Sequence, residues 1–378
     1  MGPLVGVRII EFAAAGPAPF CAMMLADMGA SIITIDRPLS VTPLVAPHYD
    51  VLRRNRSAIA VDLKTSQGLS CVNRLIQRAD MLIEGFRPGA MERLGLGPDA
   101  ARAANPRLVY GRVNGWGQDG ALARMPGHDI NFLALSGALD SIRRAGYPPS
   151  TPLNMLGDFA AGGMLLTVGL LAALHHARTS GSGQIVEAAM VDGLALLMAS
   201  LFSARAGGPA HATSEAVLSG KAPWYDVYET KDCKYFAVGC LEPQFFANLL
   251  KVLELDAAWL PHQHALEHWH MLRTELETKF KGRTRDEWTT AFDGVEACAT
   301  PVLTLDEALN HPHLRARHVF TSAGRHAQGS PAPRFSGTPA QPPREGRAFG
   351  DALREWNINE DDLALMCAAS TPMTSRVD

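Results

Sequence analysis

The chain has 378 residues, a length typical of two or three domains and sufficient to bury a large core. Its 35 Lys and Arg residues against 38 Asp and Glu residues give a formal net charge of −3, and 47% of its residues are hydrophobic. This composition excludes a coiled coil and a disordered chain, and the lack of a basic excess argues against nucleic-acid binding.

The N-terminal part of the chain alternates between two hydrophobic periods. Residues 7–12 form a short apolar run, residues 19–28 carry apolar side chains at helical spacing, and residues 31–36 again resemble a strand. The alternation continues with a strand at 57–63, a helix at 65–78, a strand at 81–84, a helix at 89–94 and a strand at 108–113. Strands and helices that take turns in this way predict a parallel sheet with helices on both faces.

Two stretches rich in Gly, Ser or Pro divide the C-terminal part. Beyond a strand at 185–191, the first of them resembles a linker and leads to a strand at 235–238 and helices at 244–253 and 269–280. The Pro-rich stretch at 330–344 is expected to cross between domains in extended form, ahead of a helical tail at 351–369.

The six cysteines contain no C-x-x-C pair, and no Cys/His cluster has the spacing of a zinc site. We therefore expect no metal and no disulfide framework, and a reducing cytoplasm fits best. The N-terminus lacks the pattern of a signal peptide, and no segment reaches about 18 consecutive apolar residues. The longest apolar stretch, residues 159–174, is expected to be a buried helix rather than a membrane span.

Nucleotide-binding motifs are missing from this α/β pattern. Asp36 ends the second predicted strand, where a ribose-binding acid would lie, but the first strand is followed by AAAGPAP rather than by G-x-G-x-x-G. Neither a Walker sequence nor a G-x-S-x-G elbow occurs. The sequence therefore argues against a nicotinamide or flavin enzyme, a kinase or ATPase, and an α/β-hydrolase.

Three polar residues occupy positions suited to chemistry. His128 follows a Gly-rich stretch after the last strand of the alternating series, where ligands bind in parallel sheets, although a structural histidine is an equal alternative. Asp158 precedes the long apolar helix, and Glu242 precedes a helix in the second region. Either carboxylate could simply cap its helix. The free backbone N–H groups near Asp158 could instead stabilise an oxyanion.

Together these segments resemble one family along nearly the whole chain. The matching motifs include EFAAAGPAPFCAMMLADMGA, AVDLK, EGFRPGAMERLGLGP, NPRLVYGRVNGWGQDG, GHDINFLALSGAL, PLNMLGDFAAGG, AVGCLEPQFF and FDGVEACATPVLTLDEA. They are similar to those of α-methylacyl-CoA racemases, within the third family of CoA-transferases. At Lys221, Cys240 and Leu241 the chain departs from the pattern, which leaves the preferred acyl group open.

The resemblance implies a role for each matched residue. His128 and Asp158 would be the two acid/base residues on either side of the substrate α-carbon, and Glu242 would form a hydrogen bond near His128. The residues implied to contact coenzyme A are Arg37, Val61, Asp62, Leu63, Lys64, Glu84, Gly85, Phe86, Arg87, Arg93, Gly127, Asp129, Ile130 and Asn131. Coenzyme A enters as part of the substrate, so no separate cofactor is expected.

The resemblance also implies an α/β fold in which a large Rossmann-like parallel-sheet domain and a smaller α+β domain are joined by two long linkers. We expect the large domain in residues 1–203, a linker at 204–223, the small domain at 224–320, a second linker at 321–346 and a C-terminal helix at 347–378 that returns to the large domain. Two such subunits would interlock as a homodimer, and neither nucleic acid nor a membrane is expected as a partner.

The implied activity interconverts (2R)- and (2S)-2-methylacyl-CoA thioesters through an enolate, with one base on each face of the α-carbon. The main alternative is CoA transfer between carboxylates, in which Asp158 would attack the thioester. Such a transferase generally resembles P-x-Y-D where this chain has Pro126-Gly127-His128-Asp129. A non-catalytic acyl-CoA binding protein would not need His128, Asp158 and Glu242, and all three are present.

Overall fold

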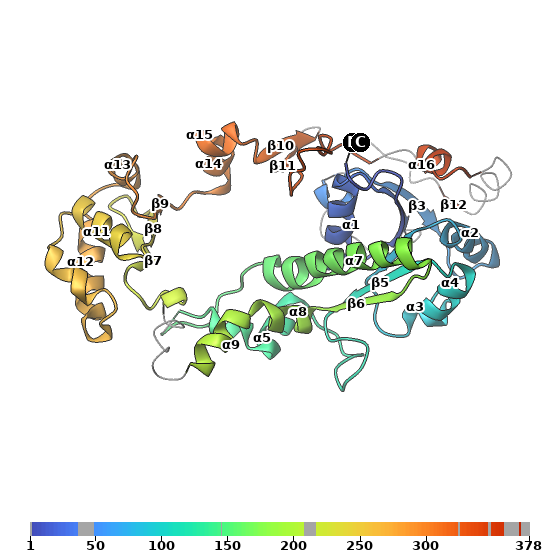
Figure 1. Cartoon of the computed structure of the whole chain (residues 1–378), viewed down its shortest axis with the longest axis horizontal. Helices are drawn as coiled ribbons and strands as arrows, with labels where there is room; N and C mark the ends of the chain where they lie inside the picture. The colour runs from blue at the N-terminus through green and yellow to red at the C-terminus, as the bar shows by residue number, and fades with distance from the viewer. Residues whose placement is uncertain are drawn as a thin grey trace. The chain divides into compact units, whose positions relative to one another are not determined.

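A computed structural model of the chain describes residues 2–36, 49–144, 146–207, 217–323, 326–346, 349–358 and 370–371. The chain divides into two compact units, which are considered separately (Figure 1). The first comprises Met1–Ser136, Pro152–Leu197 and Leu314–Asp378, and the second comprises Gly137–Thr151 and Met198–His313.

The first unit is built on a sheet with the strand order β12-β3-β2-β1-β4-β5-β6. Its strands are β1 (Arg8–Phe12), β2 (Ser31–Asp36), β3 (Ser57–Val61), β4 (Met81–Glu84), β5 (Val109–Asn114), β6 (Ile185–Ala189) and β12 (Ser370–Thr371). Strands β1 to β6 are parallel, whereas β12 pairs antiparallel with β3. The predicted parallel sheet is confirmed, and its order 3-2-1-4-5-6 is that of a doubly wound α/β fold.

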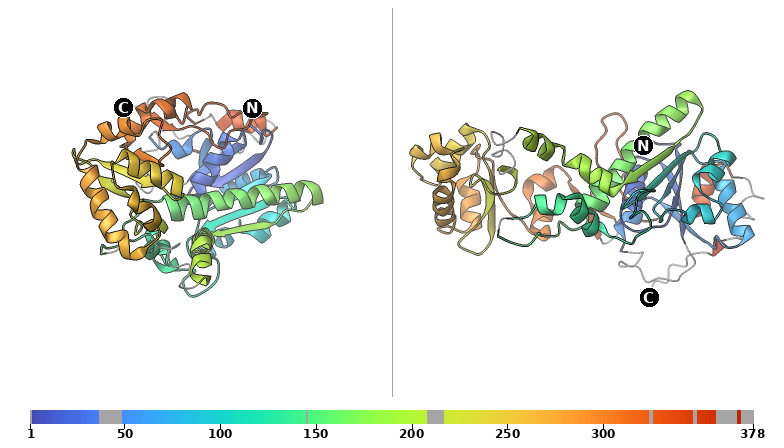
Figure 2. Two further views of the ribbon diagram at one scale, coloured as in Figure 1. Left: turned by 60° about the vertical axis from the view of Figure 1, so that its left-hand side comes forward. Right: turned by 90° about the horizontal axis from the view of Figure 1, so that it is seen from below.

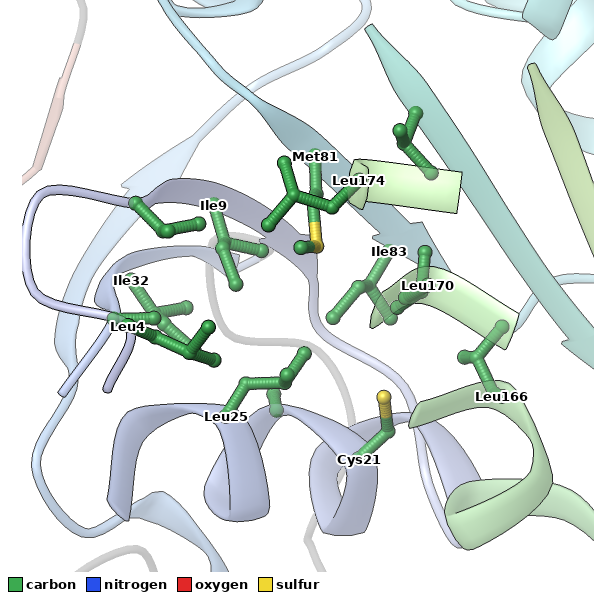
Figure 3. Close-up of a cluster of buried hydrophobic side chains, with 14 of the residues drawn as sticks. Leu4, Ile9, Cys21, Leu25, Ile32, Met81, Ile83, Leu166, Leu170 and Leu174 are labelled. Carbon is green, nitrogen blue, oxygen red and sulfur yellow. The ribbon is translucent and has the colours of Figure 1, made fainter. Parts of the chain in front are cut away.

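Helices cover both faces of this sheet because successive side chains of a strand point to opposite faces. Ile9 of β1 lies in one hydrophobic cluster with Leu25 and Leu170, whereas the next residue, Ile10, lies in another with Leu75. Figure 3 shows the first cluster. The helices and 3₁₀ turn of the unit are α1 (Pro17–Asp27), η1 (Val51–Arg53), α2 (Ser66–Ile76), α3 (Ala90–Arg93), α4 (Pro98–Ala104), α5 (Asp129–Ser136), α7 (Leu165–Ser180), α8 (Met190–Leu197) and α16 (Phe349–Glu355).

A π-helical segment, η2 (Met155–Met164), runs directly into α7, which crosses one face of the sheet (Figure 2, green). Together they form an apolar helix, Met155–Ser180, that is long enough to cross a membrane by length and composition, a test that core helices of soluble proteins also pass. Residues 159–174 were expected to form a buried helix, and in the structure only the face of this helix toward the sheet is buried. Leu166 and Leu170 are buried against the sheet, whereas Val168 is 63% exposed.

Within the first unit, its C-terminal segment packs against its N-terminal segment. Buried Arg54 donates to Asp27 of α1 and to the side-chain oxygen of Gln328, which lies on β11 (His326–Gly329). Strand β11 pairs with β10 (Phe320–Ala323). Trp356, which follows α16, donates its indole N–H to Ser31 of β2 at 3.0 Å.

The second unit contains a three-stranded antiparallel sheet of β7 (Tyr225–Glu229), β8 (Tyr235–Gly239) and β9 (Ala299–Pro301). The rings of Phe236, Phe280 and Phe292 stack in its core. Its helical elements are α6 (Ala138–Ser141), α9 (Ala199–Ala206), α11 (Pro243–Val252), η4 (Ala257–His262), η5 (Leu266–His268), α12 (Trp269–Phe280), α13 (Arg285–Ala291) and α14 (Leu305–Asn310), and α15 (Pro312–Ala316) leads back to the first unit. Within this unit, Arg144 pairs with buried Asp226 at 3.0 Å.

Candidate active site

The strand order of the first unit reverses between β1 and β4, and ligands of open α/β sheets bind outside the carboxyl ends of the strands at such a point. The segments after these two strands are in close contact. A Cβ atom on Gly85, which follows β4, would lie 3.1 Å from the Cβ of Ala14 and 3.2 Å from that of Ala18. The predicted site residues of the first unit are therefore considered relative to this edge of the sheet.

Asp158 lies over the N-terminus of α1. A Cβ atom on Gly16, which precedes α1 and has a φ of 74°, would lie only 2.8 Å from a carboxylate oxygen of Asp158. A helix N-terminus favours negative charge, so this position suits a carboxylate. Because η2 begins at Met155, Asp158 lies inside the helical segment and is not its N-cap, which corrects the capping alternative.

Small residues allow η2 to approach α1 this closely. A Cβ atom on Gly162 would lie 2.7 Å from the Cβ of Pro17, and one on Gly163 would lie 2.8 Å from the carbonyl oxygen of Pro17. The rings of Phe20 and Phe159 stack beside this contact, with centroids 4.4 Å apart. The GDFAAGG motif is thus explained by close helix packing, and π-helical turns of this kind occur frequently at functional sites.

Asp129 holds the first turn of η2. One carboxylate oxygen accepts the backbone N–H of Asp158 at 2.7 Å, and the backbone of Gly157 also donates to this side chain. A Cβ atom on Gly157 would lie 2.4 Å from the same carboxylate oxygen, so only glycine fits here. The sequence predicted that backbone N–H groups near Asp158 could stabilise an oxyanion. Those of Gly157 and Asp158 instead donate to the carboxylate of Asp129.

The surroundings of Asp158 favour its protonated form. Burial, followed by the negative charge of Asp129, raises the pKa of Asp158 above its usual range. A hydrogen bond from Asn154 and the charge of His128 lower this pKa, but they do not cancel the increase. Because Asp129 directly follows His128 and accepts the backbone N–H of Asp158, the segments that carry His128 and Asp158, 30 positions apart in the sequence, meet in the fold.

His128 immediately precedes α5, on the segment that follows β5. Its backbone N–H donates to the side-chain oxygen of Asn131 at 3.0 Å, and its carbonyl accepts the N–H of Asn131 at 2.8 Å. The residue is exposed, as is Ile130. Gly127 lies against the ring of Phe132, where a Cβ atom would approach to 2.7 Å. The backbone at the start of α5 is thus fixed while His128 remains accessible.

Glu242 belongs to the second unit, where it precedes α11. Its backbone has N-cap geometry, but its side chain makes no capping hydrogen bond. Glu242 is therefore a helix-terminal carboxylate, as the alternative interpretation expected, but one without a side-chain capping hydrogen bond. The implied hydrogen bond of Glu242 near His128 stays a prediction.

The segments implied to contact coenzyme A follow β3 and β4. Val61 is buried in the core at the end of β3, Leu63 packs against the same core, and a side-chain oxygen of Asp62 accepts the backbone N–H of Lys64 at 3.0 Å. After β4, Phe86 is partly buried against this core. The two segments therefore have firmly anchored backbones beside exposed side chains.

Glu84 is buried and its carboxylate is engaged inside the protein. It pairs with Arg112 of β5 at 3.1 Å and accepts the backbone N–H of Phe86 at 2.8 Å, and Arg112 also pairs with Glu92 at 2.8 Å. Burial raises the pKa of Glu84 despite these partners. Arg112 was not among the residues predicted from the sequence, although a charged residue inside the apolar strand VYGRVN indicates a buried partner.

Lys64, Arg87 and Arg93 are exposed, and none of them has a carboxylate partner among the residues that the structure describes. Guanidinium and ammonium groups at the carboxyl edge of the sheet are suited to bind phosphate. Arg37 lies outside the described residues. Among the described residues, no group of three or more His, Cys, Asp or Glu side chains could hold a metal ion.

Comparisons with known proteins agree with this arrangement. The profile of CoA-transferase family III matches residues 4–348. The chain is 41% identical to the mouse (Mus musculus) alpha-methylacyl-CoA racemase and 40% identical to the human (Homo sapiens) one, each over 95% of both chains. It is also 31% identical to succinyl-CoA–D-citramalate CoA-transferase of Chloroflexus aurantiacus, over 97% of both chains.

Solved structures show the same fold. A CAIB/BAIF family protein from Brucella suis superposes with a TM-score of 0.79 at 21% identity, covering 93% of this chain and 98% of that one. A hypothetical protein from Mycobacterium tuberculosis gives a TM-score of 0.77 at 25% identity, covering 92% of this chain and 97% of that one. The chain belongs to CoA-transferase family III, as its motifs predicted.

Proposed function

We propose that this protein is a racemase that interconverts (2R)- and (2S)-2-methylacyl-CoA thioesters by moving the α-proton. The observation that carries the proposal is the hydrogen bond from the backbone of Asp158 in η2 to Asp129, the residue after His128, because it joins the two segments that carry His128 and Asp158. The 40–41% sequence identity of this chain to alpha-methylacyl-CoA racemases, over nearly its full length, supports the same activity.

The proton transfer uses one group on each face of the α-carbon. In one direction the carboxylate of Asp158 takes the α-proton and the imidazolium of His128 returns a proton to the opposite face, and in the other direction the roles reverse. The protonated form of Asp158 is accessible because burial and Asp129 raise its pKa. The thioester bond stays intact throughout, and the reaction needs no added cofactor.

The enolate oxygen requires a hydrogen-bond donor as charge develops on it. The backbone N–H groups of Gly157 and Asp158 are occupied by Asp129. The backbone N–H groups of Asp129 and Ile130 lie in the first turn of α5 and donate to no acceptor among the described residues. Such free N–H groups are usual at a helix N-terminus. We assign enolate stabilisation to this turn, beside His128.

Substrate binding uses the cations at the carboxyl edge. Lys64, Arg87 and Arg93 hold the coenzyme A phosphates, and the backbone after β3 and β4 lines the same site. Coenzyme A is thus a part of the substrate. The acyl chain extends toward His128 and Asp158, and in the assembled enzyme Glu242 positions His128.

CoA transfer between carboxylates is the second candidate, because the family includes transferases such as the Chloroflexus relative. In that reaction Asp158 would attack the thioester as a nucleophile. The racemase is favoured because His128 supplies the second acid/base group that proton transfer to the opposite face requires.

The apolar surface of the first unit supports a homodimer, which we propose is interlocked and works in the cytoplasm without a nucleic-acid or membrane partner. Several large apolar side chains of neighbouring helices are at least 47% exposed: Leu135, Met155, Met164, Val168, Leu196 and Leu197. A second copy of the chain that covers them would also account for the half-exposed apolar helix Met155–Ser180.

The racemase activity is tested by incubating the protein with single enantiomers of 2-methylacyl-CoA thioesters in D₂O. We expect one α-deuterium per turnover, detected by mass spectrometry, and loss of optical purity without any added cofactor. His128→Ala should reduce racemisation by about 10²-fold or more, because it removes one acid/base group. Arg354→Ala, a change at an exposed residue of α16, is the control and should leave the rate unchanged. Absence of deuterium uptake across a broad thioester panel would contradict the proposal.

The influence of Asp129 on Asp158 is tested by the pH dependence of kcat/KM. Asp129→Asn removes the negative charge but keeps an oxygen that can accept the backbone N–H groups. Because that charge raises the pKa of Asp158, its removal should lower this pKa and move the acid limb of the profile to lower pH. Asp119→Asn, at an exposed position after β5, should leave the limb in place. An acid limb that stays put or moves upward in Asp129→Asn is the contrary result.

The dimer is tested by equilibrium sedimentation over a wide range of concentrations. We expect a mass twice the 40.6 kDa of the chain at every concentration, because interlocked chains cannot separate while folded. A folded monomer that appears on dilution would exclude interlocking.

A further inference from the structure

A pocket of about 270 Å³ opens at the amino edge of the sheet, the edge opposite the candidate active site. Arg8, at the start of β1, lines one side, and Asp80, which precedes β4, lies next to it. Arg78 follows α2, Arg107 precedes β5, and Arg178 comes from the last turn of α7. Side chains from separate parts of the sequence thus converge on one concave site.

The pocket carries a strong positive charge. Four arginines face one carboxylate, that of Asp80, which accepts the backbone N–H of Arg8 at 2.8 Å and lies 3.6 Å from its guanidinium. The lining thus contains more arginines than carboxylates, in a protein whose net charge is −3. A cleft lined by one sign of charge concentrates ions of the opposite sign.

These arginines could instead serve to neutralise the negative C-terminal ends of α2 and α7. The structure satisfies those ends in other ways. The side-chain amide of Asn105 donates to the carbonyl oxygen of Ile76, the last residue of α2, at 2.9 Å and to that of Ala79, just beyond the helix, at 2.8 Å. Gly181, with a φ of 78°, closes α7 by donating its N–H to the carbonyl of Ala177.

Two of the arginines are available to a ligand. Arg107 and Arg178 are exposed, and within the described ranges neither side chain has a hydrogen-bond acceptor or a carboxylate partner. The floor beneath them is rigid, because Leu174 and Ala177 of α7 are buried in the core. Guanidinium groups on a fixed floor are suited to bind phosphate oxygens in pairs.

We propose that this pocket is a second anion site, which binds a compact phosphorylated ligand of about the size of a diphosphate. Its volume falls just below the roughly 300–1,000 Å³ of pockets that enclose drug-sized ligands, so it is too small for a whole coenzyme A molecule. Because it lies at the opposite edge of the sheet from the cations that follow β3 and β4, both sites can be occupied at once. The proposal is independent of the reaction that the protein catalyses.

Isothermal titration of the full chain with inorganic pyrophosphate tests the proposal, in low salt and with or without saturating coenzyme A. We expect one pyrophosphate per chain in both conditions. The double variant Arg107→Ala/Arg178→Ala should weaken binding about tenfold or more, because it removes two charged donors. Arg354→Ala, which removes an exposed arginine of α16, should bind as the wild type does. If circular dichroism shows that the double variant is misfolded, Arg107→Gln alone is measured.

Three outcomes would overturn the proposal. The first is no binding at millimolar pyrophosphate. The second is undiminished binding by the arginine variants. The third is binding that saturating coenzyme A abolishes and that Arg87→Ala weakens, which would place pyrophosphate on the cations proposed to hold the substrate phosphates.

Discussion

The close contact between η2 and the N-terminus of α1 is the constraint on which the proposed site depends. It requires glycine at positions 16, 162 and 163, because a side chain at any of them would collide with the partner helix or with the Asp158 carboxylate. The contact places Asp158 beside the carboxyl end of β1, at the reversal of strand order. Asp129 then fixes the start of η2 and joins it to the turn that carries His128. A sheet edge, two helix starts and the two residues proposed as acid and base are thereby held as one arrangement.

The same contact determines the electrostatics. Burial of Asp158 and the charge of Asp129 raise its pKa, which brings the protonated and ionised forms closer in free energy. A residue that alternates as acid and base requires this balance. Asp129 thus both orients the backbone and adjusts the charge of its neighbour. The ion pair of Glu84 with Arg112 joins the adjacent strands β4 and β5.

Helices and strands whose formation depends on local hydrophobic periodicity could be predicted from the sequence. The strand at Met81–Glu84 and the helix at Trp269–Phe280 lie where hydrophobic periodicity placed them. The parallel sheet with helices on both faces followed from the strand–helix alternation, whereas the order of its strands was not predicted. The positions of His128 and Asp158 in the sequence marked them as candidates, but their assignment as the two acid/base residues came only through the family resemblance. Contacts between distant segments, which no local pattern encodes, determine the roles of Gly16 and Asp129, the π-helical turn and the partner of Arg144.

The predicted domain boundaries placed residues 137–151 in the large domain. In the structure these residues belong to the second unit, where Arg144 pairs with Asp226.

The central claim is that Asp158 exchanges a proton with the substrate and never attacks the thioester. It is tested most directly by incubating the protein with 2-methylacyl-CoA and hydroxylamine, followed by intact-mass and peptide mass spectrometry and a measurement of free coenzyme A. A racemase leaves the protein mass unchanged and releases coenzyme A no faster than hydroxylamine does from the thioester without protein, while the substrate still loses its optical purity. Conversion of Asp158 to a hydroxamate, or a covalent enzyme–coenzyme A thioester, would contradict this account and identify CoA transfer instead.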